Sequence, residues 1–209
     1  MSQFFQIHPE NPQPRLIKQA AEIVRSGGVI IYPTDSSYAL GCRLGDKAAL
    51  ERIRRLRQLD DKHNFTLACC GLSQLSLFAK VDTAAFRLLK TWTPGPYTFI
   101  LNATREVPRI MMHPKRRTVG LRIPAHPIAQ ALLAELGEPL LSSSLILPGE
   151  KLPMSDPEEM RRHFERQVDL IVDGGGGGLE ASTVINLADG EPRILRIGCG
   201  DPAPFTEPA

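Results

Sequence analysis

A short apolar run followed by a polar turn constrains the fold of this chain more than any other segment. The run Gly28-Val29-Ile30-Ile31 has no polar side chain, which predicts a strand buried on both faces. The ten residues from Tyr32 to Gly41 contain a proline, an aspartate and several hydroxyl side chains. Loops that follow buried strands often bind small polar molecules in α/β proteins. A strand-to-helix turn capped by Thr34 or Asp35 fits the same residues, and composition does not decide between the two interpretations.

The length and composition of the chain favour one domain with a sizeable core. It has 209 residues, of which 42% are hydrophobic. No apolar segment approaches the roughly 18 residues that cross a membrane, and the first residues lack the apolar stretch of a secretion signal. We therefore expect a cytoplasmic protein. The four cysteines lack metal-binding spacing, and Cys69 and Cys70 are adjacent in an apolar segment, so we expect reduced thiols and no metal site.

Helical and extended patterns alternate along the chain. The patterns, caps and stops predict helices that begin at Pro14 and after Asp46, and others at 73–79, 83–90, 127–136 and from a capping box at 155–158 to about 165. Strands are predicted at 28–31, 65–70, 97–102, 118–123, 168–172, 182–186 and 193–197. This alternation is typical of an α/β fold with a twisted mixed sheet flanked by helices. The glycines at 174–178 lack the lysine of a phosphate-binding loop, so we interpret them as a flexible connector.

Two segments place polar side chains where a ligand could reach them. In the strand at 118–123, period two puts Thr118, Gly120 and Arg122 on one face, which is either a ligand-binding surface or the exposed half of an edge strand. The serine run at 142–144 lacks the pattern of a nucleophile elbow, so we expect it to bind a ligand or to form a turn rather than to act as a covalent nucleophile.

Charge is unevenly distributed, although the net charge is only +2. One basic cluster lies on the second predicted helix and the loop after it, and comprises Arg52, Arg54, Arg55, Arg57 and Lys62. Another comprises Arg105, Arg109, Lys115, Arg116 and Arg117. Either cluster could contact phosphates, and either could be a solvated face.

Four motifs in a fixed order carry a resemblance to a known family. They are the turn at 33–41, the segment Pro94-Gly95-Pro96-Tyr97-Thr98, the stretch from Thr118 to Pro124, and Ser182-Thr183-Val184 with Arg196 downstream. With these motifs the chain resembles the YrdC/YciO family, and more closely its YciO branch, over residues 14–200. The resemblance implies a single YrdC-like domain, with 1–13 as an N-terminal segment and 201–209 as a C-terminal tail.

The resemblance also implies an activity. The best-known members of the family are threonylcarbamoyl-AMP synthases, which join threonine, bicarbonate and ATP and release pyrophosphate, a step toward threonylcarbamoyladenosine in tRNA. A nucleotidyltransferase with ATP as substrate, assisted by Mg²⁺, is therefore expected. Two alternatives stay open: an enzyme that acts on a related adenylate, and a protein that binds double-stranded RNA or tRNA without synthase activity. The RNA-contact candidates are Arg54, Arg55, Lys115, Arg116 and Arg117.

By resemblance, the site has two sides. The threonine side would comprise Ser36, Tyr38, Arg122, Ser142 and Ser182. The nucleotide side would comprise Arg57, Lys62, Thr118, Ser144 and Arg196, with Arg57 and Ser144 as the catalytic pair. 

The chain departs from the family pattern mainly on the nucleotide side. Leu59 stands where the family has an arginine, Ile146 where it has an asparagine, and Cys70 where a histidine often follows. Losing two charge-assisted contacts of about 1.5–3 kcal/mol would slow a reaction by roughly 10²- to 10⁴-fold. Lys62, in a longer loop, is expected to restore one of them.

Overall fold

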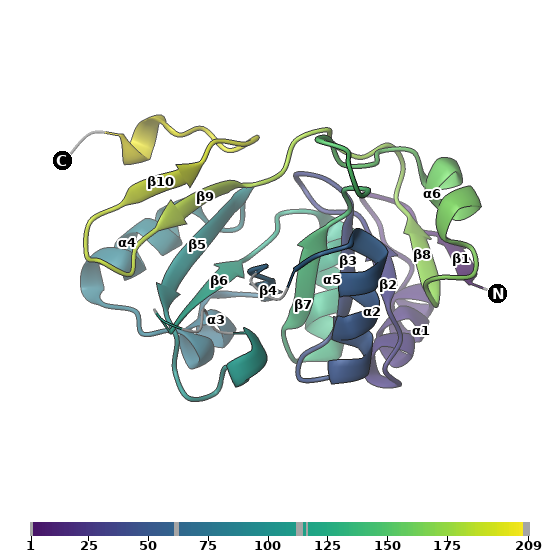
Figure 1. The fold of residues 1–209 in the computed structure, drawn as a ribbon, viewed down its shortest axis with the longest axis horizontal. Helices are drawn as coiled ribbons and strands as arrows, with labels where there is room; N and C mark the ends of the chain where they lie inside the picture. Colours follow the sequence, from purple (N-terminus) through teal and green to yellow (C-terminus); the bar gives the residue numbers. More distant parts are fainter. Residues whose placement is uncertain (1, 61–62, 112–114, 116, 207–209) are drawn as a thin grey trace.

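The computed structural model describes residues 2–60, 63–111, 115 and 117–206 (Figure 1). Within this part of the chain one ten-stranded sheet runs through the molecule. Its strands are β1 (Gln3–Gln6), β2 (Ile30–Tyr32), β3 (Ala39–Arg43), β4 (Thr66–Ala68), β5 (Tyr97–Asn102), β6 (Thr118–Arg122), β7 (Leu140–Ser144), β8 (Leu170–Asp173), β9 (Thr183–Asn186) and β10 (Arg193–Arg196). Their order across the sheet is β1-β8-β2-β3-β7-β4-β6-β5-β9-β10. Parallel and antiparallel neighbours both occur, so the predicted mixed sheet is confirmed.

The helices begin and end at recognisable signals. They are α1 (Pro14–Arg25), α2 (Lys47–Arg57), α3 (Leu72–Phe78), α4 (Thr83–Trp92), α5 (Pro127–Leu136) and α6 (Pro157–Phe164), with 3₁₀ turns at Arg109–Met111 and Ala203–Phe205. The Asp46 carboxylate accepts a hydrogen bond from the backbone N–H of Ala49 and caps α2. Gly137 ends α5 in the left-handed conformation, where a glycine has no steric penalty. The predicted bounds of α5 are confirmed.

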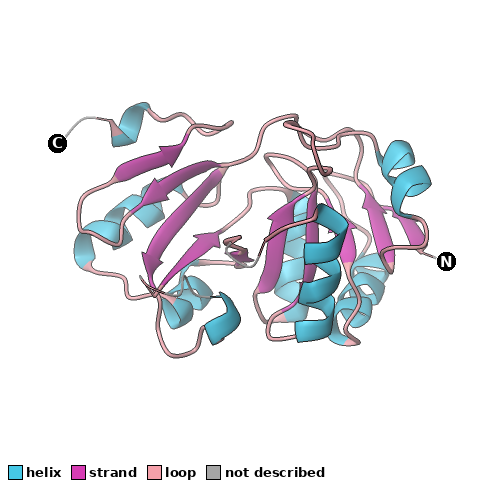
Figure 2. Cartoon of the chain, in the orientation of Figure 1, coloured by secondary structure: helices cyan, strands magenta, loops and turns pink. Residues whose placement is uncertain are grey.

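Two apolar clusters pack on opposite faces of the sheet. The ribbon shows α2 in front of β3 and β7 and α5 behind them (Figures 1 and 2). One face is covered by α2, α3, α4 and α6, which contribute Ile53, Leu75, Leu89 and Phe164. The other is covered by α1 and α5, which pack over β2, β3 and β8 and, at Ala68 and Leu140, over parts of β4 and β7. They leave β5, β9 and β10 without a helical cover on that side. The sheet therefore has one closed face and one face that is only half closed.

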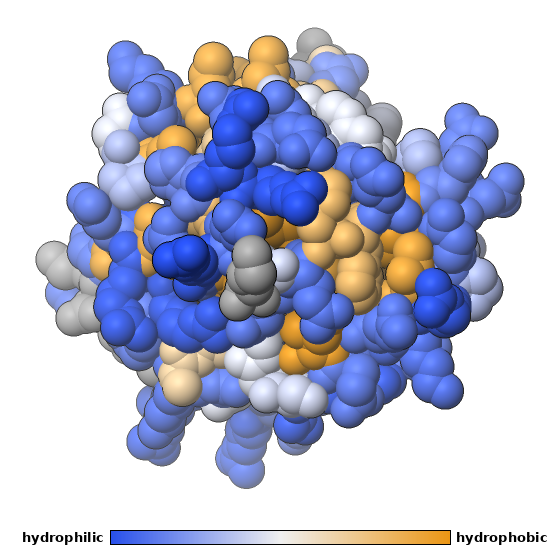
Figure 3. All heavy atoms as spheres, turned by 90° about the vertical axis from the view of Figure 1, so that its right-hand side faces the viewer, coloured by the Kyte–Doolittle hydropathy of each residue, from blue (hydrophilic) through white to orange (hydrophobic). Residues whose placement is uncertain are grey.

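The N-terminal segment contributes a strand that the sequence did not predict. Residues Gln3–Gln6 pair in parallel with Leu170–Asp173 and extend the sheet at its edge. The burial of β1 is partial, with two exposed and two half-buried residues, so its apolar pattern is weak. A side view of this end of the molecule shows mostly hydrophilic side chains with small apolar areas between them (Figure 3). Among the helices that the structure describes, none is both long and apolar enough to cross a membrane.

The glycine run at 174–178 is not a flexible connector, which corrects the prediction. A Cβ atom on Gly178 would lie 2.0 Å from the backbone oxygen of Ser36, and one on Gly177 would lie 2.5 Å from the ring of Tyr38. The Tyr38 hydroxyl donates to the carbonyl of Gly175 at 2.7 Å and accepts from the N–H of Gly174 at 3.0 Å. The run is therefore a packed strap that lies directly over the turn at 33–41.

Candidate functional site

The half-open face of the sheet carries a row of small side chains. Strand register places Ser142 beside Thr66, Thr66 beside Gly120, and Gly120 beside Ile100. Neighbours in register point to the same face of a sheet, so these residues form a common floor. The cluster that packs against α1 and α5 reaches Leu140 of β7 and Ala68 of β4 but includes none of these floor residues, which line a pocket instead. The alternation predicted for Gly120 and Arg122 is confirmed.

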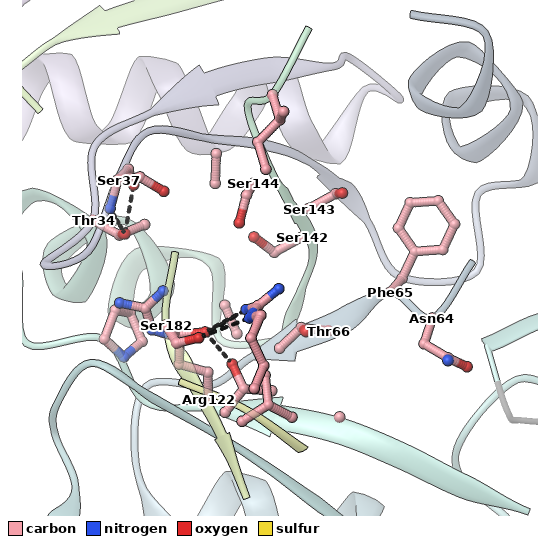
Figure 4. A pocket seen from close by; sticks show the side chains of 18 of the residues that line it. Thr34, Ser37, Asn64, Phe65, Thr66, Arg122, Ser142, Ser143, Ser144 and Ser182 are labelled. Atoms are coloured by element: carbon pink, nitrogen blue, oxygen red, sulfur yellow. Dashed lines mark hydrogen bonds between the residues drawn. The ribbon is translucent and has the colours of Figure 1, made fainter. Parts of the chain in front are cut away.

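A pocket of about 330 Å³ lies on this floor. Figure 4 shows Ser142, Ser143 and Ser144 in succession along β7, with Thr34 and Ser37 on one side of them and Asn64 and Phe65 on the other. The turn at 33–41, the C-terminal end of α2 and strand β10 also contribute lining residues. The pocket is thus built from segments that are far apart in the sequence, and both basic and hydroxyl side chains line it.

Arg122 is held in a fixed position at one side of the pocket. It is 9% exposed. Its Nη1 donates to the Ser36 hydroxyl at 2.7 Å, and its Nη2 donates to Asp35 Oδ1 at 2.6 Å. Thr34 in turn shapes the loop, because its hydroxyl donates to the carbonyl of Ser37 at 2.6 Å. The polar turn therefore positions an arginine from another strand.

Ser142 and Ser182 are each held by a second hydroxyl group. Ser142 Oγ lies 2.8 Å from the Tyr32 hydroxyl, and Ser182 Oγ lies 2.7 Å from Thr98 Oγ1. Arg196 donates to the carbonyl of Ser182 from Nε and Nη2 at 3.1 and 2.8 Å. These bonds orient hydroxyl groups that can both donate to and accept from a ligand.

The C-terminal end of α2 supplies a second arginine. Nη1 of Arg57 donates to Ser143 Oγ at 2.6 Å, and Nε donates to the carbonyl of Ile146 at 3.1 Å. Ser143 Oγ also lies 3.4 Å from Nε2 of His63. Ser143 consequently connects the helix, the strand β7 and the loop before β4.

Positive charge accumulates in the pocket. Burial, followed by the nearby charge of Arg196, lowers the pKa of Arg57, while burial and then Arg122 lower that of Arg196. Burial and the charge of Arg57 lower the pKa of His63 to about 4, so its imidazole is neutral near pH 7. Arg57 and Arg196, each close to a further arginine, make this part of the pocket suited to an anionic ligand.

The structure brings six of the predicted site residues into the pocket lining: Arg57, Arg122, Ser142, Ser144, Ser182 and Arg196. Among the described residues, neither Ser36, Tyr38 nor Thr118 is in that lining. The Ser36 hydroxyl accepts a hydrogen bond from Arg122, and the Tyr38 hydroxyl donates one to the glycine strap. Thr118 lies two positions before Gly120 on β6. Lys62 lies outside the described residues.

Several lining residues escaped the sequence analysis. Thr66 and Thr98 lie on strands next to predicted residues, and period-two alternation with strand pairing would have indicated them. Ser143 belongs to the predicted serine run but was not among the predicted site residues. His63 and Asn64 lie in an irregular loop, which gives no periodic signal. The sequence predicts Asp35 either in a ligand-binding turn or as a helix cap, whereas in the structure it is the ion-pair partner of Arg122.

The three residues at which the chain departs from the family pattern lie in different environments. Ile146 lines the pocket with an apolar side chain, beside the carbonyl that binds Arg57. Leu59 is partly buried and packs against the apolar cluster on the closed face. Cys70 follows β4 and is not in the lining.

The candidates for RNA contact differ in how far they are exposed. Arg54 is paired with Glu51 at 2.8 Å, its side chain is 12% exposed, and its guanidinium carbon lies 5.9 Å from the centroid of the Phe65 ring. Arg55, Lys115 and Arg117 are exposed, and Arg116 lies outside the described residues. Contact of these residues with RNA stays a prediction.

Comparisons with known proteins find relatives over most of the chain. The Sua5_yciO_yrdC family model, described as "Telomere recombination", matches residues 22–198. The chain is 61% identical over 205 residues to "Uncharacterized protein YciO" of Escherichia coli K12, covering 98% of this chain and all of that protein. The crystal structure of E. coli YciO matches with a TM-score of 0.95 over the same shares of the two chains.

More distant relatives carry names that state an activity or a ligand. The chain is 32% identical over 178 residues to the threonylcarbamoyl-AMP synthase of Halorhodospira halophila, covering 85% of this chain and 92% of that protein. The structure of P. abyssi Sua5 complexed with L-threonine matches with a TM-score of 0.85 at 30% identity, over 93% of this chain and 57% of that one. The family match and these identities extend over most of the chain, which confirms the resemblance. The chain belongs to the Sua5/YciO/YrdC family and has its fold.

Proposed function

We propose that this protein binds L-threonine and ATP in the pocket on the half-open face and forms threonylcarbamoyl-AMP. The observation that carries the proposal is the arrangement of the arginines. Arg122 lies beside the polar turn at 33–41, while Arg57 lies at the end of α2 beside Ser143. A carboxylate and a chain of phosphates could each find a cation in such a pocket. The threonine complex of a related Sua5 supports the amino-acid end.

The reaction needs orientation and charge neutralisation more than it needs a protein nucleophile. Bicarbonate and the amino group of threonine combine to a carbamate with loss of water. A carbamate oxygen then attacks the α-phosphorus of ATP, and the bond from that phosphorus to the bridging oxygen breaks, so that pyrophosphate leaves. Arg57 and Arg196 would offset the charge on the phosphates, and Ser142 and Ser182 would orient the amino acid.

A magnesium ion is expected to accompany the triphosphate. Groups of three or more His, Cys, Asp or Glu that could hold a metal do not occur among the residues that the structure describes. The residues present therefore do not fit an ion held by the protein itself, and no step is assigned to one. Phosphate oxygens are the natural ligands of Mg²⁺ in such reactions.

Release of pyrophosphate tests the proposal. Purified protein at high concentration, supplied with ATP, threonine and bicarbonate, should release pyrophosphate only when all three are present. The rate should be low, since Leu59 and Ile146 lack the polar groups of the family pattern, at a cost of roughly 10²- to 10⁴-fold. A complete mixture that releases no more pyrophosphate than mixtures lacking threonine or bicarbonate would contradict the proposal.

An alternative for the same pocket is a reaction on a related adenylate. It is favoured by Ile146, whose apolar side chain lines the pocket next to Arg57. Under this alternative ATP binds, but pyrophosphate release depends on an acyl donor other than carboxylated threonine. Replacing threonine by other amino acids and by simple carboxylates in the same assay distinguishes the two.

A further inference from the structure

The loop before β4 places the imidazole of His63 at the end of the pocket that Arg57 and Ile146 line, where the chain departs from the family pattern. His63 lines the pocket together with Arg57 and Ser143. Its ring packs edge-on against Phe65, with the centroids 5.1 Å apart and the planes at 80°. Its backbone N–H donates to the carbonyl of Asp60 at 3.2 Å. The side chain of His63 is thus half-buried against Phe65, and its backbone is held by the hydrogen bond to Asp60.

Hydrogen bonds determine which atoms of Arg57, Ser143 and His63 donate and which accept. The guanidinium of Arg57 can only donate, so the oxygen of Ser143 accepts from it at 2.6 Å. The hydroxyl proton of Ser143 is then available for Nε2 of His63, which lies 3.4 Å away. Donation by a cation polarises the hydroxyl and strengthens its own donation to the next acceptor. A neutral imidazole protonated on Nδ1 completes this chain.

We infer that His63 is a positioning residue for phosphate groups: it orients the Ser143 hydroxyl and, through it, the Arg57 guanidinium at the nucleotide end of the pocket. The inference rests on the proposed function in taking phosphates as the ligands of this end. The His63 imidazole thereby contributes a polar group at an end of the pocket where Leu59 packs against the apolar core. Ile146 contributes only one polar group there, the carbonyl that accepts a hydrogen bond from Arg57.

The charged groups around His63 come from several elements. They are Arg54 and Arg57 of α2, Asp60 of the following loop and Arg196 of β10. Three of these are cations, and the first effect on the ring is its burial. This environment keeps the imidazole neutral near pH 7, which is the state that accepts the proton of Ser143.

Calorimetric titration with inorganic pyrophosphate tests the inference without requiring catalysis. His63→Ala and Ser143→Ala should each weaken pyrophosphate binding about three- to tenfold, the range for one lost hydrogen bond. The double variant should bind no more weakly than the weaker single variant, because both residues act through one chain. His63→Gln should bind within about twofold of the wild type, since its amide oxygen can accept the same proton.

Controls separate positioning from folding. His163→Gln replaces a histidine on α6, outside the pocket lining, and should bind as the wild type does. Thermal unfolding of every variant identifies loss of structure. Nitrogen-15 NMR of the wild type should show His63 protonated on Nδ1 and not on Nε2 near neutral pH.

The outcomes are distinguishable. Unchanged binding by His63→Ala, additive effects in the double variant, or the Nε2-protonated tautomer would each overturn the role of His63. If pyrophosphate binding depends on His63 but threonine-dependent release of pyrophosphate is absent, the proposed function fails and the role of His63 stands. If the wild type does not bind pyrophosphate, both fail.

Discussion

At the scale of single residues, the pocket is defined by groups whose partners lie elsewhere in the sequence. Arg122 and Asp35 form an ion pair whose side chains are only 11% and 15% exposed. Asp35 Oδ2 and Arg122 Nε are buried, and neither has a hydrogen-bond partner among the described residues. A buried pair of this kind costs desolvation energy and is weak evidence for stability. Its evident effect is to fix the direction of Arg122 beside the proposed amino-acid end of the pocket.

A pH dependence of stability is expected from His63. Its pKa is about 4 in the folded protein and 6.5 ordinarily, so the unfolded chain takes up the proton first as the pH falls. The contribution of His63 to the free energy of unfolding should therefore be largest above pH 6.5 and decrease as the pH falls from there to about 4. Below that pH the contribution of His63 should change no further. Urea unfolding of the wild type and of His63→Gln, measured between about pH 7 and about pH 4, checks this.

The comparison between these two proteins isolates the histidine. His126, whose pKa is also lowered by burial, is present in both. As the pH falls, the wild type should lose more unfolding free energy than His63→Gln, because only the wild type carries this histidine. Curves that stay parallel over this range would contradict the environment described for His63.

At the scale of elements, the glycine strap packs tightly against the polar turn. The strap at 174–178 passes over Ser36 and Tyr38 so closely that side chains at Gly177 and Gly178 have no room. Gly177 also donates its N–H to the carbonyl of Ser155 at 2.9 Å, which anchors the strap to the loop before α6. The strap thereby supports Ser36, and through it Arg122.

Gly178→Ala tests this support. The added methyl would lie 2.0 Å from the carbonyl oxygen of Ser36, so the turn or the strap must move. We expect a loss of about 1–3 kcal/mol in the free energy of unfolding and weaker threonine binding, measured by urea unfolding and calorimetry. Gly176→Ala is the matched control, because nothing lies within 4 Å of its added methyl. Equal behaviour of the two variants would refute the close packing.

Periodic elements were predictable from sequence and the irregular parts of the site were not. The helix at 127–136 and the strand at 97–102 have the predicted bounds, since an amphipathic pattern and clear stop signals delimit them. Strand alternation also predicted the face of Gly120 and Arg122. The strap and His63 depend on tertiary contacts, because a glycine run has the same composition whether it is mobile or packed, and a loop imidazole has no periodicity.

At the scale of the whole molecule, the site follows from how unevenly helices cover the sheet. Four helices close one face, whereas α1 and α5 close the other face only over β8, β2 and β3 and over parts of β7 and β4. The remaining strands carry small residues in register, and the pocket forms there. The ends of the pocket come from the turn at 33–41 and from α2, which lie on different strand connections. This separation provides a physical basis for the two adjoining ligand sites that we propose.

Calorimetry of L-threonine and ATP, each alone and each in the presence of the other, tests most directly whether the pocket holds two ligands. The wild type should bind both at once. Arg122→Ala, checked for folding, should bind ATP normally and threonine about tenfold more weakly or worse, and Arg57→Ala should show the reverse. Mutual exclusion of the two ligands, or equal loss of both in each variant, would contradict a pocket with an amino-acid end and a nucleotide end.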